Sequence, residues 1–94
     1  MLADKEHIVI TVMGRDRVGI VAGVSKVLAD YNLNIVDISQ TILHDIFAMI
    51  LLVDISQSKC SLADLEKPLK TAGDELGVKI VIQHEDIFRY MHRI

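Results

Sequence analysis

The sequence predicts a single α+β domain whose four strands and two helices alternate in the order βαββαβ. Four short stretches rich in β-branched residues indicate the strands, and two longer stretches with apolar residues at helical spacing indicate the helices. A chain of 94 residues leaves room for one domain, spanning residues 1–94. We expect a core over residues 7–84, with a four-stranded antiparallel sheet, and an extra short helix over residues 86–94.

The first strand is predicted at residues 8–13, a β-branched run that ends at Gly14. Its alternation places one apolar set on a single face, namely Ile8, Ile10 and Val12. A helix is predicted from Val18, with Asp16 as its N-cap. Its apolar stripe repeats at helical spacing and comprises Val21, Val24, Leu28 and Tyr31, with Lys26 and Asp30 on the far side. The asparagines on either side of Leu33 should end this helix.

A hairpin follows, with strands predicted at residues 35–43 and 46–53 and a turn at His44 and Asp45. In the first of these strands Ile35 lies out of phase with the alternating set, which comprises Val36, Ile38, Gln40 and Ile42. A bulge near Asp37 would account for the mismatch. The second strand is apolar on both faces, which is typical of a central strand that is covered above and below.

The second helix is marked by apolar residues at helical spacing, which are Leu62, Leu65, Leu69, Ala72 and Leu76. Ser61 is its predicted cap and Gly77 its stop. Pro68 lacks a backbone donor, so a kink or a later helix start is expected there. The last strand should place Val78, Ile80 and Ile82 on one face, and Asp86–Arg93 is predicted to be helical.

With right-handed crossovers and one hairpin, this order gives a ferredoxin-like sandwich. Two helices cover only one face of four strands. We expect the other face to carry Val9, Thr11, Met13, Phe47, Met49, Leu51, Val53 and Val81, or the alternate set if the registers shift by one. Exposing such a face to water would forgo several kcal/mol. Together with the 51% hydrophobic content, this predicts a homodimer.

The end of the chain carries an apolar stripe formed by Ile87, Phe88, Met91 and Ile94. A helix this short is unstable alone in water. We therefore expect it to dock on the uncovered sheet face, either of its own subunit or of the partner subunit.

Composition excludes several classes of function. A net charge of −3 gives no basic surface for nucleic acid or anionic membranes. The polar start of the chain does not resemble a signal peptide, and the single cysteine, Cys60, cannot form an internal disulfide. The histidines lack the short spacing of a metal site; they are His7, His44, His84 and His92. The sequence predicts a cytoplasmic protein without catalytic residues, metal or cofactor.

The segment Gly14–Ile20 is the strongest candidate for a binding site. Its glycines allow a close approach to backbone N–H groups, and the helix N-terminus behind them favours an anion such as a carboxylate. Asp16 could instead accept a hydrogen bond from a ligand ammonium group. The alternative is purely structural, with Gly14 in a turn, Asp16 as a cap, and the two arginines of the segment, Arg15 and Arg17, solvated.

The pattern across the chain resembles the ACT domain over residues 7–84. The resemblance rests on Gly14-x-Asp16-Arg17-x-Gly19-Ile20-Val21-Ala22, Leu28-Ala29, Leu33-Asn34-Ile35 and Ile38-Ser39-Gln40. The tail through Phe88, Tyr90 and Met91 is similar to a family of short stand-alone ACT proteins related to the glycine-cleavage regulator type. The resemblance implies a regulatory module that binds an amino acid or another small metabolite between paired domains and acts on a separate partner protein.

The resemblance also implies a ligand site formed by Gly14, Asp16, Gly19 and Asn34. Further ligand or interface contacts are expected from Arg15, Arg17, Ile20 and Ile35. In serine-sensing members a histidine stands at the position of Gly14 and an amide at that of Asp16, so this chain differs at both. Asn34 matches, and it is expected either close to the Gly14–Gly19 loop or reaching the loop of a partner chain.

Two other functions compete with this interpretation. A module that dimerises and docks on an enzyme or regulator without a small ligand would use the same scaffold. An acylphosphatase-like hydrolase would share the strand and helix order. That chemistry needs an arginine just inside the first helix, where this chain continues Ile20-Val21-Ala22-Gly23.

Overall fold

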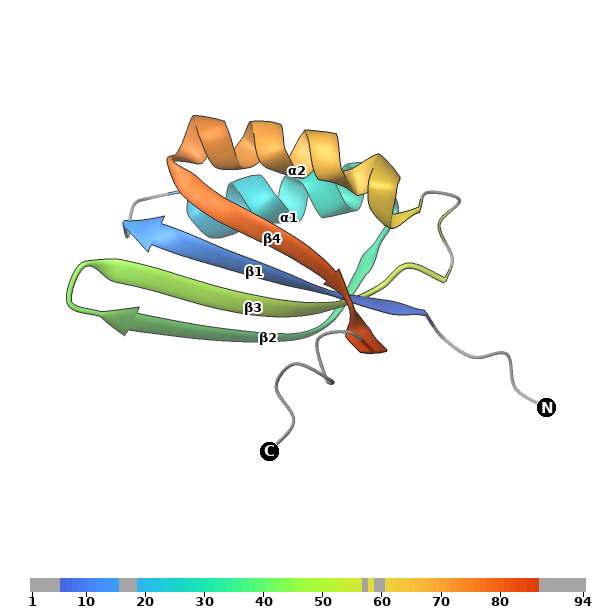
Figure 1. Cartoon of the computed structure of the whole chain (residues 1–94), viewed down its shortest axis with the longest axis horizontal. Coiled ribbons are helices and arrows are strands. Elements are labelled where there is room, and N and C mark those ends of the chain that lie inside the picture. Colours follow the sequence, from blue (N-terminus) through green and yellow to red (C-terminus); the bar gives the residue numbers. More distant parts are fainter. Residues whose placement is uncertain (1–5, 16–18, 57, 59–60, 87–94) are drawn as a thin grey trace.

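In the computed structural model, which describes residues 6–15, 19–56, 58 and 61–86, one antiparallel sheet packs against two helices (Figure 1). The strands are β1 (His7–Arg15), β2 (Asn34–Leu43), β3 (Ile46–Asp54) and β4 (Val78–His84), and the helices are α1 (Ile20–Asp30) and α2 (Leu62–Leu76). The strands lie side by side in the order β2-β3-β1-β4. This is the predicted ferredoxin-like βαββαβ sandwich.

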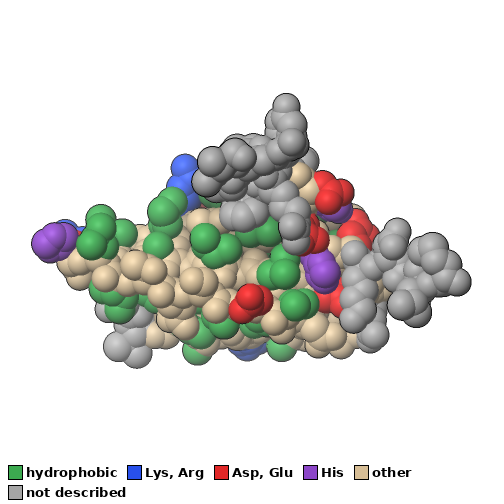
Figure 2. Space-filling model, turned by 90° about the horizontal axis from the view of Figure 1, so that it is seen from below, with side chains coloured by type: hydrophobic (Ala, Val, Ile, Leu, Met, Phe, Trp, Pro, Cys, Tyr) green, Lys and Arg blue, Asp and Glu red, His purple; other side chains and the backbone are tan. Residues whose placement is uncertain are grey.

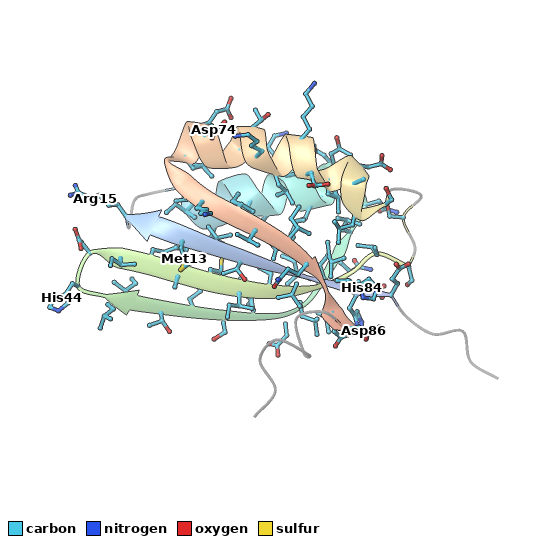
Figure 3. The ribbon with its side chains drawn as sticks, viewed as in Figure 1. Met13, Arg15, His44, Asp74, His84 and Asp86 are labelled. Carbon is cyan, nitrogen blue, oxygen red and sulfur yellow. The ribbon has the colours of Figure 1, made fainter. Side chains whose placement is uncertain are left out.

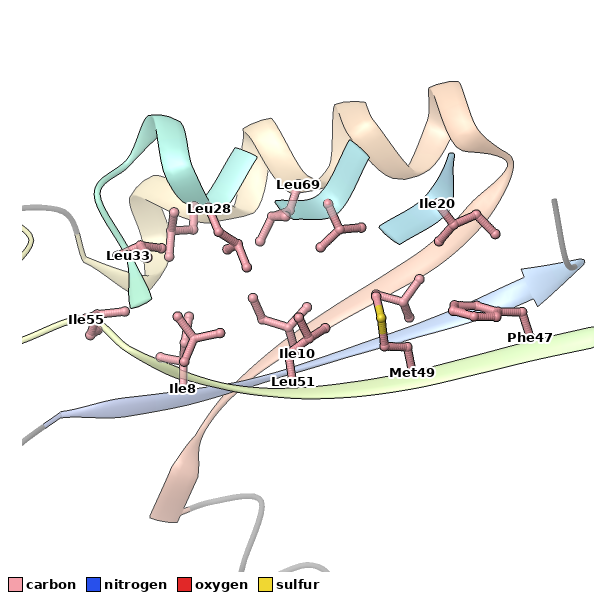
Figure 4. Close-up of a cluster of buried hydrophobic side chains, with 14 residues drawn as sticks. Ile8, Ile10, Ile20, Leu28, Leu33, Phe47, Met49, Leu51, Ile55 and Leu69 are labelled. Carbon is pink, nitrogen blue, oxygen red and sulfur yellow. The ribbon is translucent and has the colours of Figure 1, made fainter. Parts of the chain in front are cut away.

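The core lies between the helices and one face of the sheet (Figure 4). Alternate residues of β1 and β3 point into it because side chains of a strand alternate between its two faces. The fully buried residues are Ile8, Ile10, Val12, Met49, Leu51 and Val53 from the strands and Ile20, Val24, Leu28, Leu65 and Leu69 from the helices. The predicted core faces of β1 and α2 are confirmed.

Of the two sets predicted for the uncovered face of β3, the first-named is wrong and the alternate set is found. Leu51 pairs with Ile10 and Met49 with Val12, and directly paired residues share a face, so Phe47, Met49, Leu51 and Val53 all point toward the helices. The other face of β3 carries the alternate set, Ile46, Ala48, Ile50 and Leu52. Ile50 is 41% exposed, so β3 is central but is not covered on both sides within one chain. Both sets of β3 are apolar, so alternation alone did not distinguish the two faces.

Helix α1 begins later than predicted. Its N-cap is Gly19, at φ 93°, with no side-chain cap, so the predicted start at Val18 and the predicted cap Asp16 are wrong. Val18 and Asp16 themselves lie outside the described residues. The buried stripe is Ile20, Val24 and Leu28, while Val21, one position out of phase, is 37% exposed.

Helix α2 begins at Leu62 as its capping box dictates. The backbone N–H of Ser61 donates to the Asp64 carboxylate at 2.8 Å, and the N–H of Asp64 donates to Ser61 Oγ at 3.3 Å. Pro68 lies inside the helix, so the expected later start is wrong. Gly77 ends the helix at φ 74°, as predicted.

Strand β2 is an edge strand, and all ten of its residues are exposed. Its register with β3 passes from Ile35 to Asp37 and skips Val36, which confirms the predicted bulge. The bulge places Ile35, Ile38 and Ile42 on the helix side of the sheet, opposite buried residues of β3. His44, at φ 59°, forms the hairpin turn.

The predicted terminal helix extends beyond the described residues, which end at Asp86. Docking of the tail on the sheet would bury its apolar stripe. Deleting residues 86–94 removes that burial and is therefore expected to lower the free energy of unfolding by a few kcal/mol. Thermal unfolding of the truncated and full-length chains measures this difference. Superimposable melting curves would contradict docking.

Candidate functional site

Gly14 lies near the end of β1, where β4 comes close. A Cβ at this position would lie 2.8 Å from Val78 Cγ1 and 3.0 Å from Val78 Cα, so a side chain would force the two strands apart. Strand β1 continues through Gly14 to Arg15 rather than ending there as predicted. Packing against β4 is therefore sufficient to require glycine at this position.

Arg15 ends β1 beside the β2–β3 hairpin. Its Nε lies 3.9 Å from the Asp45 carboxylate, and both side chains are exposed. An exposed pair at this distance contributes little to stability. Arg15 is thus available to an anionic ligand or to a neighbouring chain. The next two predicted site residues, Asp16 and Arg17, lie outside the described residues.

Gly19 requires glycine for a different reason. Its φ of 93° lies in the left-handed region, and nothing lies within 4 Å of the position a Cβ would take. The first turn of α1, which is fully described, has neither an acidic residue nor a side-chain cap. The first turn of α1 therefore has no acidic side chain of its own against the positive end of the helix dipole, an arrangement suited to a carboxylate. Ile20 is only 2% exposed in the core, so its side chain cannot contact a ligand as predicted.

Asn34 lies at the opposite end of the sheet from this loop. It pairs with Asp54, which in turn pairs with His7 at the start of β1. From the level of His7 to Gly14 the strand rises about 23 Å. Figure 3 shows the same separation, with Arg15 near one end of the sheet and His84 and Asp86 near the other. The expectation that Asn34 lies close to the loop of its own chain is therefore wrong.

Only a second chain can therefore unite the predicted residues. Asn34 and Ile35 are exposed at the start of the edge strand, where a neighbour could reach them. The α1 N-terminus offers backbone donors and Asn34 offers one amide. The described residues of this region supply backbone hydrogen-bond donors, one amide and a helix dipole, which suit the binding of a small polar ligand.

Two histidines lie at the Asn34 end of the sheet. His7 Nδ1 lies 2.9 Å from Glu85 Oε1, and His84 Nε2 lies 3.6 Å from Glu6 Oε2, so the start of β1 and the end of β4 are joined by two cross-strand pairs. Sequence reasoning missed these pairs because the residues are far apart in the chain. Among the residues that the structure describes, no three His, Cys, Asp or Glu side chains gather as a metal site would require.

A hollow of about 550 Å³ between the two helices was also not predicted. Its floor is apolar and its rim charged, with Val27, Tyr31, Pro68 and Leu76 among the lining residues. Gly23 lets the helices approach there, since a Cβ on it would lie 2.9 Å from Leu76 Cδ1. A glycine inside an amphipathic helix indicates a close approach of another element, so Gly23 could have predicted the contact between the helices from the sequence.

The fold and this arrangement define a class of protein, a small ferredoxin-like domain whose first strand is followed by a helix with no side-chain cap at its N-terminus. The family model of the ACT domain matches residues 6–83. Over 88 residues the chain is 63% identical to a UPF0237 protein of Methanocaldococcus jannaschii, covering 94% of this chain and 98% of that protein. The chain belongs to the ACT-domain family.

Solved structures agree with this assignment. An ACT domain protein from Streptococcus pneumoniae is 44% identical, with a TM-score of 0.79 over 90% of this chain and 96% of that chain. The regulatory subunit of aspartate kinase from Thermus thermophilus shares the fold at 24% identity, with a TM-score of 0.66 over 83% of this chain and 51% of that chain. None of the helices in the described part of the chain is long and apolar enough to cross a membrane.

Proposed function

We propose that this protein is a cytoplasmic regulatory module that binds a small molecule, with an amino acid as the expected effector, and acts on a separate partner protein without catalysis of its own. Membership of the ACT family supports the regulatory role. So does the shared fold with a subunit whose name describes it as regulatory. The proposal depends most on the position of Asn34 relative to the α1 N-terminus.

That position implies a site between two chains. Strands β1 and β2 run in the same direction, so β2 begins at the His7 end and finishes at the level of Arg15. If two β2 strands pair antiparallel about a two-fold axis, Asn34 of each chain meets the end of the partner's β2. The partner's β1–α1 loop lies at that same end, two strands from the partner's β2 and therefore three strands, or about 14 Å, from Asn34.

Strand β2 is suited to such pairing. It is an edge strand of ten exposed residues, so its outer backbone groups are open to a further strand. On its helix side it exposes Ile35 and Ile38, each 39% accessible, and Ile42, 57% accessible. Pairing two such strands would satisfy the backbone groups and remove these side chains from water. The homodimer therefore remains our proposal, with β2 as its interface.

In such a site, the ligand carboxylate would accept hydrogen bonds from the α1 N-terminus of one chain. The amide of Asn34 from the other chain would bind the carboxylate or the ammonium group. Asp16, at the loop, is the proposed ammonium partner. A ligand that contacts both chains favours one arrangement of the pair by its differential affinity, which is how it would signal to a partner protein.

A thermal-shift screen of the twenty amino acids and common nucleotides tests the proposal. One compound is expected to stabilise the protein by RT ln(1 + [L]/Kd), and both Asn34→Ala and Asp16→Ala should abolish that stabilisation. Gln40→Ala is the matched control, since Gln40 is an amide in the middle of the same exposed strand. If no compound stabilises the protein at millimolar concentration, the sensor proposal fails and the ligand-free docking module replaces it.

A further inference from the structure

The hollow between α1 and α2 lies outside the proposed ligand site. It extends from Gly23 to Tyr31 along α1 and from Lys67 to Leu76 along α2, about two turns of each helix. Figure 2 shows hydrophobic side chains spread over the side of the molecule away from the helices. On the helices themselves, Val21 is the only large hydrophobic residue that is exposed among those the structure describes. The apolar floor of the hollow is therefore a distinct feature of the helix side.

Short side chains leave space between the two helices. Gly23 lets the helices approach at one end of the hollow. Toward the other end the hollow is lined by Val27 and Tyr31 from α1 and by Pro68 and Ala72 from α2. The side chains of Pro68 and Ala72 are short, so the space of about 550 Å³ stays unfilled. An apolar side chain of another molecule would fill this space and displace water from its floor.

Charged side chains form the rim of the hollow. On α1, Lys26 Nζ donates to the Asp30 carboxylate at 3.0 Å, so these two charges satisfy each other. On α2, Lys67 and Glu75 lie eight residues or about 12 Å apart along the helix. Neither of these two forms an ion pair with any residue that the structure describes. The α2 rim therefore presents one positive and one negative charge, with the apolar floor beside them.

We propose that the hollow is the docking site for an amphipathic helix of the partner protein, with apolar side chains in the hollow, an acidic residue beside Lys67 and a basic residue beside Glu75. This inference rests on the proposed function in one point, that the chain acts on a separate protein. The two charged residues of the partner helix lie seven or eight positions apart, since every helix rises about 1.5 Å per residue. The contact covers about two turns, so we expect a weak and reversible complex.

The walls of the hollow determine that the partner segment is a helix. Inside α1 and α2 the backbone N–H groups bond to carbonyls of the same helix, so the walls offer no ladder of backbone partners. An extended segment buried there would lose hydrogen bonds to water without replacing them, whereas a helix satisfies its own backbone. A helix also packs its ridge of side chains into the groove between two others. A free amino acid, with about 3.6 Å of backbone, is too short to reach both Lys67 and Glu75.

Fluorescence anisotropy of labelled helical peptides, titrated with the full chain, tests the proposal. Three synthetic peptides share a leucine face and differ at two positions about two turns apart, which carry one Glu and one Lys, two Glu, or two Lys. The wild type is expected to prefer the peptide with one charge of each sign. Because this preference does not depend on the direction in which the peptide lies, it reports the two rim charges alone.

Reversing one rim charge should change which peptide binds best. Glu75→Lys is expected to weaken the mixed peptide about three- to fivefold and to strengthen the two-Glu peptide by a similar factor, as expected for one exposed ion pair. Lys67→Glu should instead favour the two-Lys peptide. The matched controls are Glu66→Lys and Lys70→Glu, which make the same changes of net charge on α2 outside the hollow and should leave all three affinities unchanged.

The outcomes separate helix docking from the sensor proposal. Equal binding of the three peptides by the wild type and both rim variants overturns helix docking, as does the absence of binding at millimolar peptide. A compound from the thermal-shift screen whose effect is lost in Glu75→Lys but kept in Glu66→Lys assigns the hollow to a small molecule and also overturns it. Charge-dependent peptide binding by a protein that no amino acid stabilises supports helix docking while the sensor proposal fails.

Discussion

Ile38→Lys is expected to prevent β2 pairing and to abolish ligand-induced stabilisation in one step. Ile38 lies in the regular part of the edge strand after the bulge, opposite the buried Leu51. A lysine on an edge strand opposes pairing with another strand, because its charge must either lose its hydration or hold the chains apart. Since the proposed site needs Asn34 from one chain and the loop from another, a separated chain has half a site.

Sedimentation velocity and thermal shift measure the two effects on the same sample. Asn34→Ala is the informative companion, since it should abolish the ligand response while the chains remain paired. Ala29→Lys adds the same charge on α1 and should change neither property. A variant with Ile38→Lys that dissociates but still responds fully to ligand would show that the site lies within one chain.

Leu51→Ala is expected to have the largest effect on stability. Leu51 is fully buried on β3 between the sheet and the helices, paired with Ile10. Truncating a leucine in such a core lowers the free energy of unfolding by about 3 kcal/mol, because the transfer free energy of the removed atoms is lost and a cavity is left behind. For a domain of this size, about 4–8 °C is lost per kcal/mol, so the melting temperature should fall by at least about 12 °C.

Val21→Ala is the control for Leu51→Ala. Val21 is an aliphatic residue on the exposed side of α1, so its truncation should lower the melting temperature by only a few degrees. Chemical denaturation of both variants gives the free energies of unfolding. Similar losses for Leu51→Ala and Val21→Ala would contradict the assignment of Leu51 to the core.

Local patterns predicted most of the fold. The cap at Ser61, the stop at Gly77 and the bulge near Asp37 all depend on residues close together in the chain, and each was predicted correctly. The face of β3 was not, because residues 46–53 are apolar on both sides and only pairing with β1 decides which side meets the helices. The start of α1 was missed because Asp16 was a good capping residue, whereas the chain uses Gly19 in a left-handed conformation.

The candidate site was predicted less completely, since it depends on relations between distant strands. Residue types identified Gly14 and Gly19 as glycines of a loop before a helix, but did not show that Gly14 is required by packing against Val78. The position of Asn34 followed only from the register of three strands, His7 with Asp54 and Asp54 with Asn34. Long-range pairing of this kind has no local signature in the sequence.

The bulge in β2 also limits the addition of further chains to the sheet that two β2-paired chains would form. A flat edge strand rich in isoleucine is a template for open-ended strand addition, as in fibrils. The bulge at Val36 breaks the ladder and increases the local twist, so only the stretch from Asp37 onward is a regular template. A two-fold pair through that stretch would occupy both β2 edges and leave β4 outermost, where Lys79 discourages addition. Association through β2 would then end in a closed, soluble assembly rather than a fibre.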